Sequence, residues 1–386
     1  MEIEISEKAK EIIEKEKKFY ANTFTRLPVV IERGKGCYLY DIDGKKYLDM
    51  FAGIGVNSVG HCNEKVVNAI KKQVEILMHT SNWVYTIPQI ELAEKILKLT
   101  GMEKVFFTND GTEAVEAAIK LVRRGKKKEI IAMKNDFHGR TLGALSLTWK
   151  ENFRKIFEPL IPYTKFVDYN DIDKLRKEIS ENTAAVILEP IQSESGVIIP
   201  REGYLKEVRE LTEEKGVKLI VDEVAVGFGR TGKMFCFQHE NIVPDIICMA
   251  KALGGGFPIG AIAYRGIDFE KGEHGGTYLG NPLACAAANA SIDYIIDNKL
   301  PENARIMGEY LMKELRKRNL NVRGKGLIMA IEVKDAKKSV YELIKNNVLA
   351  IYSGETTIRL LPPLIISKKE CDEFLDAVDK CKSFKE

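Results

Sequence analysis

Short apolar runs alternate with longer segments of helical periodicity through the middle of the chain, and this alternation limits the fold more than any other feature. Runs with the length and composition of buried strands occupy residues 105–108, 129–133, 184–188, 218–221, 245–249 and 261–264. Between two of them, residues 112–123 repeat alanine, leucine and valine at helical intervals. The pattern predicts an α/β fold with a mostly parallel sheet flanked by helices.

The two ends of the chain differ from this middle part. Residues 36–48 read as a β-hairpin with a turn at Asp43-Gly44. After about residue 285 we expect a long helix, a turn at residues 324–326, a strand over 327–333, a helix near 339–346 and a strand over 357–361. We expect residues 1–50 and 285–386 to form a smaller α+β domain, and residues 51–284 a larger one.

Composition and spacing exclude several classes of protein. The 59 basic and 56 acidic residues give a net charge of +3, which provides no electrostatic basis for binding nucleic acid or an anionic membrane. The seven scattered cysteines form no Cys-x-x-Cys pair and predict reduced thiols. Residues 1–18 predict a short surface helix rather than a signal peptide, and no apolar run reaches the ~20 residues needed to span a bilayer. A cytoplasmic location is expected. The histidines lack metal-ligand spacing, so no metal site is expected.

Two residues beyond expected strands indicate the chemistry. Asp222 ends the run 218–221, while Lys251 follows the run 245–249 and precedes a Gly254–Gly256 loop. An amine and a carboxylate so placed suit a lysine Schiff base with pyridoxal phosphate, in which the acid faces the pyridine nitrogen. The acid would stabilise the positive ring, and the ring could then accept electrons from the substrate. A surface lysine and a turn-capping acid are the alternatives.

Residues 109–113 come directly after an expected strand and open a helix. Gly111 allows close backbone approach, and the free amides of the first helical turn favour an anion, so this turn is a candidate phosphate site. An ordinary helix cap is the alternative.

Two arginines are candidates for binding carboxylates. Residues 137–141 follow the run 129–133, where Phe137 can stack on a planar ring and Arg140 can bind a carboxylate with two N–H groups. The alternative is a core phenylalanine beside a surface arginine. Arg359 interrupts an apolar run, where an unpaired guanidinium would be costly, so it should have an anionic partner.

Together these segments resemble the class III aminotransferases, a subgroup of the fold-type I pyridoxal phosphate enzymes, from Tyr38 to Ser367. Within that family the likeness is strongest to acetylornithine aminotransferases and to archaeal enzymes of lysine biosynthesis that act on adducts of an amino-group carrier protein. The resemblance implies a seven-stranded-type sheet and an obligate homodimer with shared active sites.

The resemblance also implies the cofactor site. Its residues would be Gly111, Thr112, Phe137, Asp222, Glu223, Val224, Ala225, Lys251 and Thr277. By this likeness Lys251 forms the covalent link, Asp222 pairs with the ring nitrogen, and Thr277 reaches the phosphate in the neighbouring subunit. Phe137 and Val224 cover the two faces of the ring.

For the substrates, the resemblance points to Arg140, Glu194, Gly276 and Arg359. Arg140 would hold the α-carboxylate of an acylated diamine, and Arg359 that of 2-oxoglutarate or glutamate. Glu194 would be a gate that pairs with Arg359 when the other substrate is bound.

The implied activity is transfer of the terminal amino group of N2-acetylornithine, or a similar N-acyl diamino acid, to 2-oxoglutarate, which yields a semialdehyde and glutamate in arginine biosynthesis. The nearest alternative is the same chemistry on lysine or ornithine bound to a carrier protein. More remote alternatives are a non-catalytic cofactor-binding or interaction protein and a mutase of the same fold.

Several positions depart from the family pattern. Ala225 stands where a glutamine usually contacts the phenolic oxygen of the cofactor. Ser193 and Ser195 replace common glycines beside Glu194, and Gly276 replaces the usual serine before Thr277. Asp110 replaces a small residue before the phosphate glycine, and we expect its carboxylate to point away from the phosphate.

Overall fold

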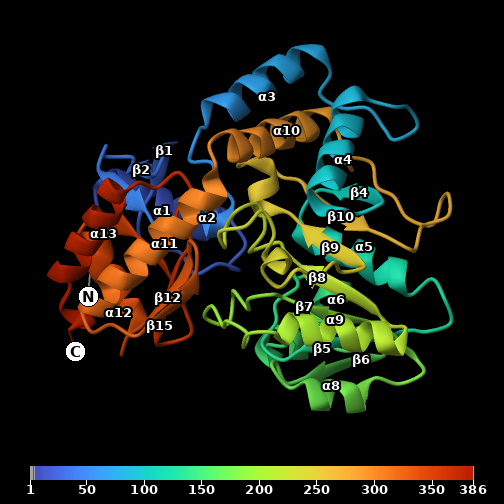
Figure 1. Ribbon diagram of the computed structural model, residues 1–386. Helices are drawn as coiled ribbons and strands as arrows, with labels where there is room; N and C mark the ends of the chain where they lie inside the picture. Colours follow the sequence, from blue (N-terminus) through green and yellow to red (C-terminus); the bar gives the residue numbers. More distant parts are fainter. Residues whose placement is uncertain (1–2, 4, 386) are drawn as a thin grey trace.

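The structure is a computed structural model that describes residues 3 and 5–385 of the chain. Its larger part is organised around a seven-stranded sheet with strand order β4-β10-β9-β8-β7-β5-β6 (Figure 1). The strands are β4 (Lys104–Thr108), β5 (Glu129–Met133), β6 (Thr164–Val167), β7 (Thr183–Leu188), β8 (Lys218–Asp222), β9 (Ile246–Met249) and β10 (Gly260–Tyr264). Only β10 runs antiparallel to its neighbours, β4 and β9. The mostly parallel α/β sheet expected from the sequence is confirmed.

Helices cover both faces of this sheet. The helices α5 (Gly111–Val122) and α6 (Leu142–Ser146) pack on one face, together with Ile130 and Ala132 of β5. On the other face α4 (Ile87–Thr100), α9 (Tyr204–Lys215) and α10 (Pro282–Asp297) share a core with Ile131 and Met133. Because successive strand residues point to opposite faces, burial on both sides requires the continuous apolar runs seen in the sequence.

The two ends of the chain meet in a smaller part, where blue and red segments lie side by side in Figure 1. One four-stranded sheet contains β1 (Ile31–Lys35), β2 (Tyr38–Asp41), β3 (Lys46–Asp49) and β13 (Val348–Leu349). The strand β13 pairs in parallel with β3 and so joins the C-terminal region to the N-terminal hairpin. A second sheet contains β11 (Val322–Lys325), β12 (Ile328–Glu332), β14 (Ile351–Ser353) and β15 (Thr357–Leu360).

The remaining helices complete these two parts. They are α1 (Glu7–Phe19), α2 (Ala52–Gly55), α3 (Glu64–Ile76), α7 (Glu151–Arg154), α8 (Ile172–Glu178), α11 (Leu300–Lys317), α12 (Ala336–Lys345) and α13 (Lys368–Lys380). The expected N-terminal helix corresponds to α1, while Met1, Glu2 and Glu4 lie outside the described residues. In the described chain no helix is long and apolar enough to cross a membrane.

The structure corrects two sequence-based expectations. The single long helix after residue 285 is wrong, because two helices, α10 and α11, precede β11. The turn expected at residues 324–326 is shorter, since Gly324 and Lys325 belong to β11 and Gly326 alone takes a positive φ of +60°. The domain limits remain a proposal: α10 spans the proposed limit at residues 284 and 285, and it packs on α3 and α4.

Candidate active site

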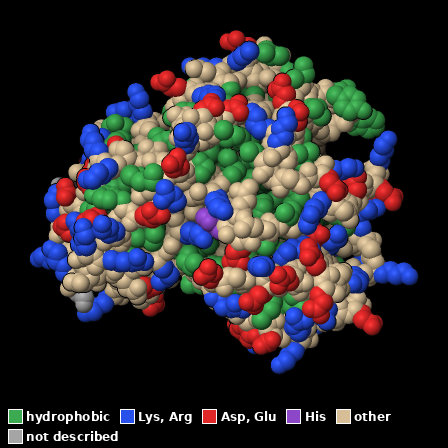
Figure 2. Space-filling view, viewed as in Figure 1, with side chains coloured by type: hydrophobic (Ala, Val, Ile, Leu, Met, Phe, Trp, Pro, Cys, Tyr) green, Lys and Arg blue, Asp and Glu red, His purple; other side chains and the backbone are tan. Residues whose placement is uncertain are grey.

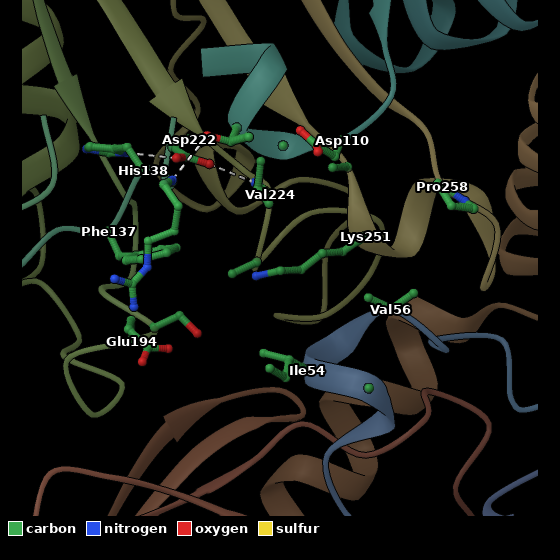
Figure 3. Close-up of a pocket in the computed structure, with 18 of the residues that line it drawn as sticks. Ile54, Val56, Asp110, Phe137, His138, Glu194, Asp222, Val224, Lys251 and Pro258 are labelled. Atoms are coloured by element: carbon green, nitrogen blue, oxygen red, sulfur yellow. Dashed lines mark hydrogen bonds and ion pairs between the residues drawn. The ribbon is translucent and has the colours of Figure 1, made fainter. Parts of the chain in front are cut away.

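A cavity of about 650 Å³ lies at the carboxyl ends of β8 and β9 and faces the smaller part of the molecule (Figure 3). The predicted site residues that line it are Gly111, Thr112, Phe137, Arg140, Glu194, Asp222, Val224, Ala225, Lys251 and Arg359. Ligands in open α/β sheets bind at this edge, and the volume is typical of small-molecule and cofactor sites. These residues, which were predicted from the sequence, therefore line a single cavity in the structure.

Lys251 supplies an amine to this cavity. It directly follows the last buried residues at the end of β9 and has a positive φ of +45°, a strained conformation for a residue with a side chain. Burial lowers the pKa of its amine, and the positive charge of Arg359 lowers it further. Figure 3 shows the side chain extending into the open space, and the amine has no hydrogen-bond partner within the described part of the chain. This is the environment of a nucleophilic or proton-accepting lysine.

Asp222 is held by two contacts at the end of β8. Its Oδ2 lies 2.8 Å from His138 Nδ1, and its Oδ1 accepts a hydrogen bond of 3.0 Å from Val224 N. Burial alone would lower the pKa of His138, but the neighbouring carboxylates of Asp136 and Asp222 outweigh it and raise this pKa to about 10. A protonated imidazole thus balances the buried carboxylate.

Glu189 is a further buried acid beside the cavity. Its Oε2 accepts a hydrogen bond of 2.8 Å from Phe137 N, and its Oε1 accepts one of 3.2 Å from Ser193 N. Burial raises its pKa to about 8, and the nearby charges of Asp136 and Asp222 raise it as well. The side chain therefore joins the loop of Phe137 to the loop that carries Glu194.

The N-terminus of α5 opens onto the cavity at Gly111 and Thr112. A Cβ on Gly111 would lie 2.8 Å from Val224 Cγ1, so close packing here requires glycine. Asp110 caps the helix by accepting a hydrogen bond of 2.9 Å from Glu113 N, which turns its carboxylate toward its own helix. The exposed amides and the helix dipole make this end suitable for an anion.

The two arginines occupy different environments. Arg359 on β15 is only 3% exposed; its Nη1 lies 2.5 Å from Glu194 Oε2, and its Nη2 donates a hydrogen bond of 3.2 Å to Ser193 Oγ. The expectation of an anionic partner is confirmed. Arg140 is exposed, and its guanidinium lies 3.4 Å from the centre of the Phe153 ring, so it is available to an incoming carboxylate.

Three predicted residues lie outside the cavity lining. Glu223 points elsewhere, because its carboxylate accepts hydrogen bonds from Cys236 N at 2.9 Å and Phe237 N at 2.8 Å. Gly276 and Thr277 lie on an exposed stretch before α10, and this single chain does not bring them to the cavity.

Sequence reasoning missed some of the lining. His138 and Glu189 both line the cavity and follow β5 and β7. Their positions just beyond the carboxyl ends of two expected strands could have marked them as site residues. Phe24, Ile54 and Val56 come from the N-terminal region and carry no local signal, because only the tertiary fold brings that region across the sheet edge.

The donor set fits pyridoxal phosphate. The N-terminus of a helix, suited to an anion, the buried carboxylate of Asp222, the flat side chain of Phe137 and the amine of Lys251 all line the same cavity. This combination, on this sheet, defines a pyridoxal phosphate-dependent enzyme of fold type I.

The comparisons specify the family. The model of the class III aminotransferases matches residues 19–381, and the chain belongs to this family of pyridoxal phosphate-dependent transaminases. It is 49% identical to a protein of Archaeoglobus fulgidus named acetylornithine aminotransferase, over 94% of this chain and 98% of that protein.

Solved structures agree in fold. The acetylornithine aminotransferase of Elizabethkingia anophelis superposes with a TM-score of 0.87 at 35% identity, covering 97% of this chain and 98% of that one. An ornithine aminotransferase of Toxoplasma gondii, described with partial occupancy of pyridoxal phosphate at its active site, has a TM-score of 0.93 at 31% identity and covers 97% and 94%.

Proposed function

We propose that this aminotransferase moves the terminal amino group of N2-acetylornithine to 2-oxoglutarate, giving the corresponding semialdehyde and glutamate, in arginine biosynthesis. The observation that carries the proposal is that Arg140 and Arg359 line the cavity of Lys251, so a carboxylate of each substrate can be held while the amine is processed. The names of the relatives support the same donor.

Different residues of the cavity would bind the cofactor and transfer the proton. When bound, pyridoxal phosphate supplies an aldehyde that takes up the amine and a ring that accepts electrons. Gly111 and Thr112 would hold its phosphate at the N-terminus of α5, and Asp222 would hold the protonated ring nitrogen. Lys251 has a lowered pKa and is therefore suited to remove a proton from the carbon that bears the amine and to return it.

Glu194 and Arg359 would separate the two substrates. The acylated diamine has a single carboxylate, for which Arg140 is available, and the Glu194 pair with Arg359 can remain closed. The dicarboxylate 2-oxoglutarate needs a second cation, so Glu194 must release Arg359. One cavity can then accept two substrates in turn, which predicts ping-pong kinetics.

We further propose that the enzyme is a cytoplasmic homodimer with shared sites. The exposed positions of Gly276 and Thr277 in the single chain support sharing, since a neighbouring subunit would have to receive them.

The first experiment is a single half-reaction. Purified holoenzyme is mixed with N2-acetylornithine in the absence of a keto acid, and the absorbance of the bound aldehyde form is followed. We expect rapid loss of that absorbance, and its recovery when 2-oxoglutarate is added. Ornithine and lysine serve as comparison donors, and Lys251→Ala as the inactive control. An unchanged spectrum with N2-acetylornithine would contradict the proposed donor.

A carrier-protein-bound donor is the second candidate, because positive side chains, the exposed Arg140 and the partly exposed Lys150, lie beside the cavity. They could contact an acidic carrier protein that presents a tethered lysine or ornithine. Competition with such a protein tests this idea: inhibition of N2-acetylornithine turnover would support it, and unchanged turnover would contradict it.

A further inference from the structure

Glu194 lies among three cations rather than one. Its Oε2 contacts Arg359 Nη1 at 2.5 Å, and its Oε1 lies 3.9 Å from Lys150 Nζ. Arg140 lines the same cavity: partial burial lowers the pKa of its guanidinium, and the Glu194 carboxylate acts in the opposite direction. A carboxylate in this position can exchange one positive partner for another by rotating its side chain.

The backbone that carries Glu194 is fixed on both sides. Ser193 is 3% exposed, its N–H is bound to Glu189, and its carbonyl accepts hydrogen bonds from Gly196 N at 3.4 Å and Val197 N at 3.3 Å. Ser353 Oγ donates a hydrogen bond to the carbonyl of Glu194 itself. These contacts hold the backbone around Glu194 and leave its side chain as the part that can reorient.

The two partners of Arg359 differ in freedom. The Glu194 side chain is 34% exposed, whereas the Ser193 hydroxyl is buried and contacts Arg359 Nη2 at 3.2 Å. If Glu194 left, Ser193 would still orient the guanidinium, whose Nε has no hydrogen-bond partner in the described structure. Arg359 would then present a free Nη1 and Nε to a new anion.

Lys150 provides the second position for Glu194. It is the residue just before α7, its side chain is 31% exposed, and its ammonium already faces the free oxygen of Glu194. A displaced carboxylate without a cation would lose charge stabilisation at this partly buried position. Lys150 removes that penalty.

We propose that Glu194 transfers from Arg359 to Lys150 when a dicarboxylate binds, while Ser193 keeps Arg359 in place. This inference rests on the proposed roles of Arg359 and Glu194, and it adds Lys150 and Ser193 as positioning residues for the keto-acid substrate. Neither residue needs to touch the reacting atoms.

Binding of glutarate to the holoenzyme tests the transfer. Glutarate has both carboxylates of 2-oxoglutarate but no keto group, so its affinity can be measured by calorimetry without turnover. Lys150→Met should weaken glutarate binding about two- to fivefold, as expected for a partly exposed ion pair. It should raise the KM for 2-oxoglutarate by a similar factor and leave kcat unchanged. The control Lys155→Met removes an exposed lysine nearby that pairs with Glu151, and should have no effect.

The Glu194→Gln background distinguishes transfer from direct attraction. Without the negative charge of Glu194 the Lys150→Met change should have no effect on glutarate affinity. An equal weakening in both backgrounds would mean that Lys150 attracts the dicarboxylate itself, and no weakening in either would mean that Lys150 has no role. Both results would overturn the transfer.

Ser193→Ala tests the fixed contact. It should weaken glutarate binding about tenfold with or without Glu194, because a hydrogen bond to a charged group is lost. Unchanged affinity would overturn the role of Ser193.

Arg359→Ala tests the proposed role of Arg359 on which this inference rests. If glutarate binds Arg359→Ala as tightly as the native protein, Arg359 does not hold the carboxylate. If the variants change glutarate affinity as expected but the half-reaction with N2-acetylornithine fails, only the proposed amino donor is wrong.

Discussion

At the scale of single residues, the site is dominated by a buried cluster in which His138 lies between two aspartates and Glu189 lies nearby. His138 Nδ1 is 2.8 Å from Asp222 Oδ2, and His138 Nε2 is 3.5 Å from Asp136 Oδ2. Because burial penalises isolated charges, a protonated His138 and a neutral Glu189 reduce the net negative charge around Asp222. The carboxylate of Asp222 therefore lies beside a positive group at the position proposed for the pyridine nitrogen.

The cluster predicts a loss of stability with rising pH. The pKa of Glu189 in the folded state is about 8, above its ordinary value of 4.5. The folded state therefore keeps a proton that the unfolded chain releases, so this contribution is fully present below about pH 4.5 and is lost as pH rises through 8. The slope for one proton is at most about 1.4 kcal/mol per pH unit. His138 acts in the same direction between its ordinary pKa of 6.5 and about 10.

Glu189→Gln should flatten the decline in the free energy of unfolding between about pH 4.5 and 8, and leave the more alkaline decline due to His138. Urea unfolding followed by circular dichroism at a series of pH values measures both slopes. The amide of Gln cannot accept the hydrogen bonds from both Phe137 N and Ser193 N as the Glu189 carboxyl does, so the variant is expected to be less stable at every pH. The slopes against pH are therefore compared rather than the absolute free energies of unfolding. An unchanged slope would show that Glu189 is ionised in the folded protein.

Arg140→Ala should lower kcat/KM for N2-acetylornithine by about tenfold or more, because a hydrogen-bonded contact to a charged group is worth roughly 1.5–3 kcal/mol. Steady-state kinetics with the donor varied measures the effect. Arg305→Ala removes an exposed arginine that pairs with Glu309 outside the cavity, and should leave the value unchanged. Equal kinetics for both variants would mean that another group holds the donor carboxylate.

At the scale of secondary structure elements, α5 combines two functions. Its apolar residues Ala114, Ala117, Ala118 and Leu121 are fully buried against the sheet, which fixes the direction of the helix. Asp110 satisfies one terminal amide, while the first turn remains directed at the cavity. Packing of the helix body therefore determines where an anion can bind at its end.

Thr112→Val should weaken binding of pyridoxal phosphate by about tenfold, because one hydroxyl contact to a charged phosphate is lost while the helix cap is retained. Titration of the apo-protein with the cofactor, followed by absorbance, gives the Kd. Thr112→Ser keeps the hydroxyl and should bind nearly as the native protein does. Equal loss in both variants would assign the effect to the shape of the side chain rather than to its hydroxyl.

At the scale of the whole molecule, an apolar surface surrounds the segment between α3 and α4. Trp83 is 94% exposed and Tyr85 is 96% exposed, and Ile87 and Met78 are also exposed. Figure 2 shows hydrophobic side chains in green projecting where Figure 1 places the loop between these helices. A surface of this kind indicates an interface with another protein, and a second copy of the chain is the partner that the proposed shared site requires.

Trp83→Asp should therefore shift the protein from dimer to monomer, because it introduces a charge into an apolar interface. Light scattering coupled to size-exclusion chromatography measures the mass, and the same fractions are assayed for transamination, which should fall with the dimer. Tyr163→Asp is the control: Tyr163 is 65% exposed but precedes β6, at the opposite edge of the seven-stranded sheet from β4. A native mass for Trp83→Asp would place the interface elsewhere.

The sequence alone determined the strands of the large sheet and named ten of the residues that line one cavity. Strands buried on both faces must be continuously apolar, so β5 was predicted within the same limits as the structure shows, and β8 and β9 within one residue. Lys251 and Asp222 could be associated because parallel strands bring their carboxyl ends to one edge. The short edge strand β6 was not predicted, because Lys165 interrupts its apolar pattern.

Only the tertiary structure decided which distant groups complete the site. The hydrogen bond between His138 and Asp222 joins segments that follow or end separate strands. Glu194 contacts Arg359 on β15 of the smaller part, and it contacts Lys150 just before α7 within the larger part. No local periodicity encodes such contacts, since they depend on side-chain packing between segments far apart in the chain. The sequence determined which groups were available, and the packing of the two parts determined their partners and therefore their charges.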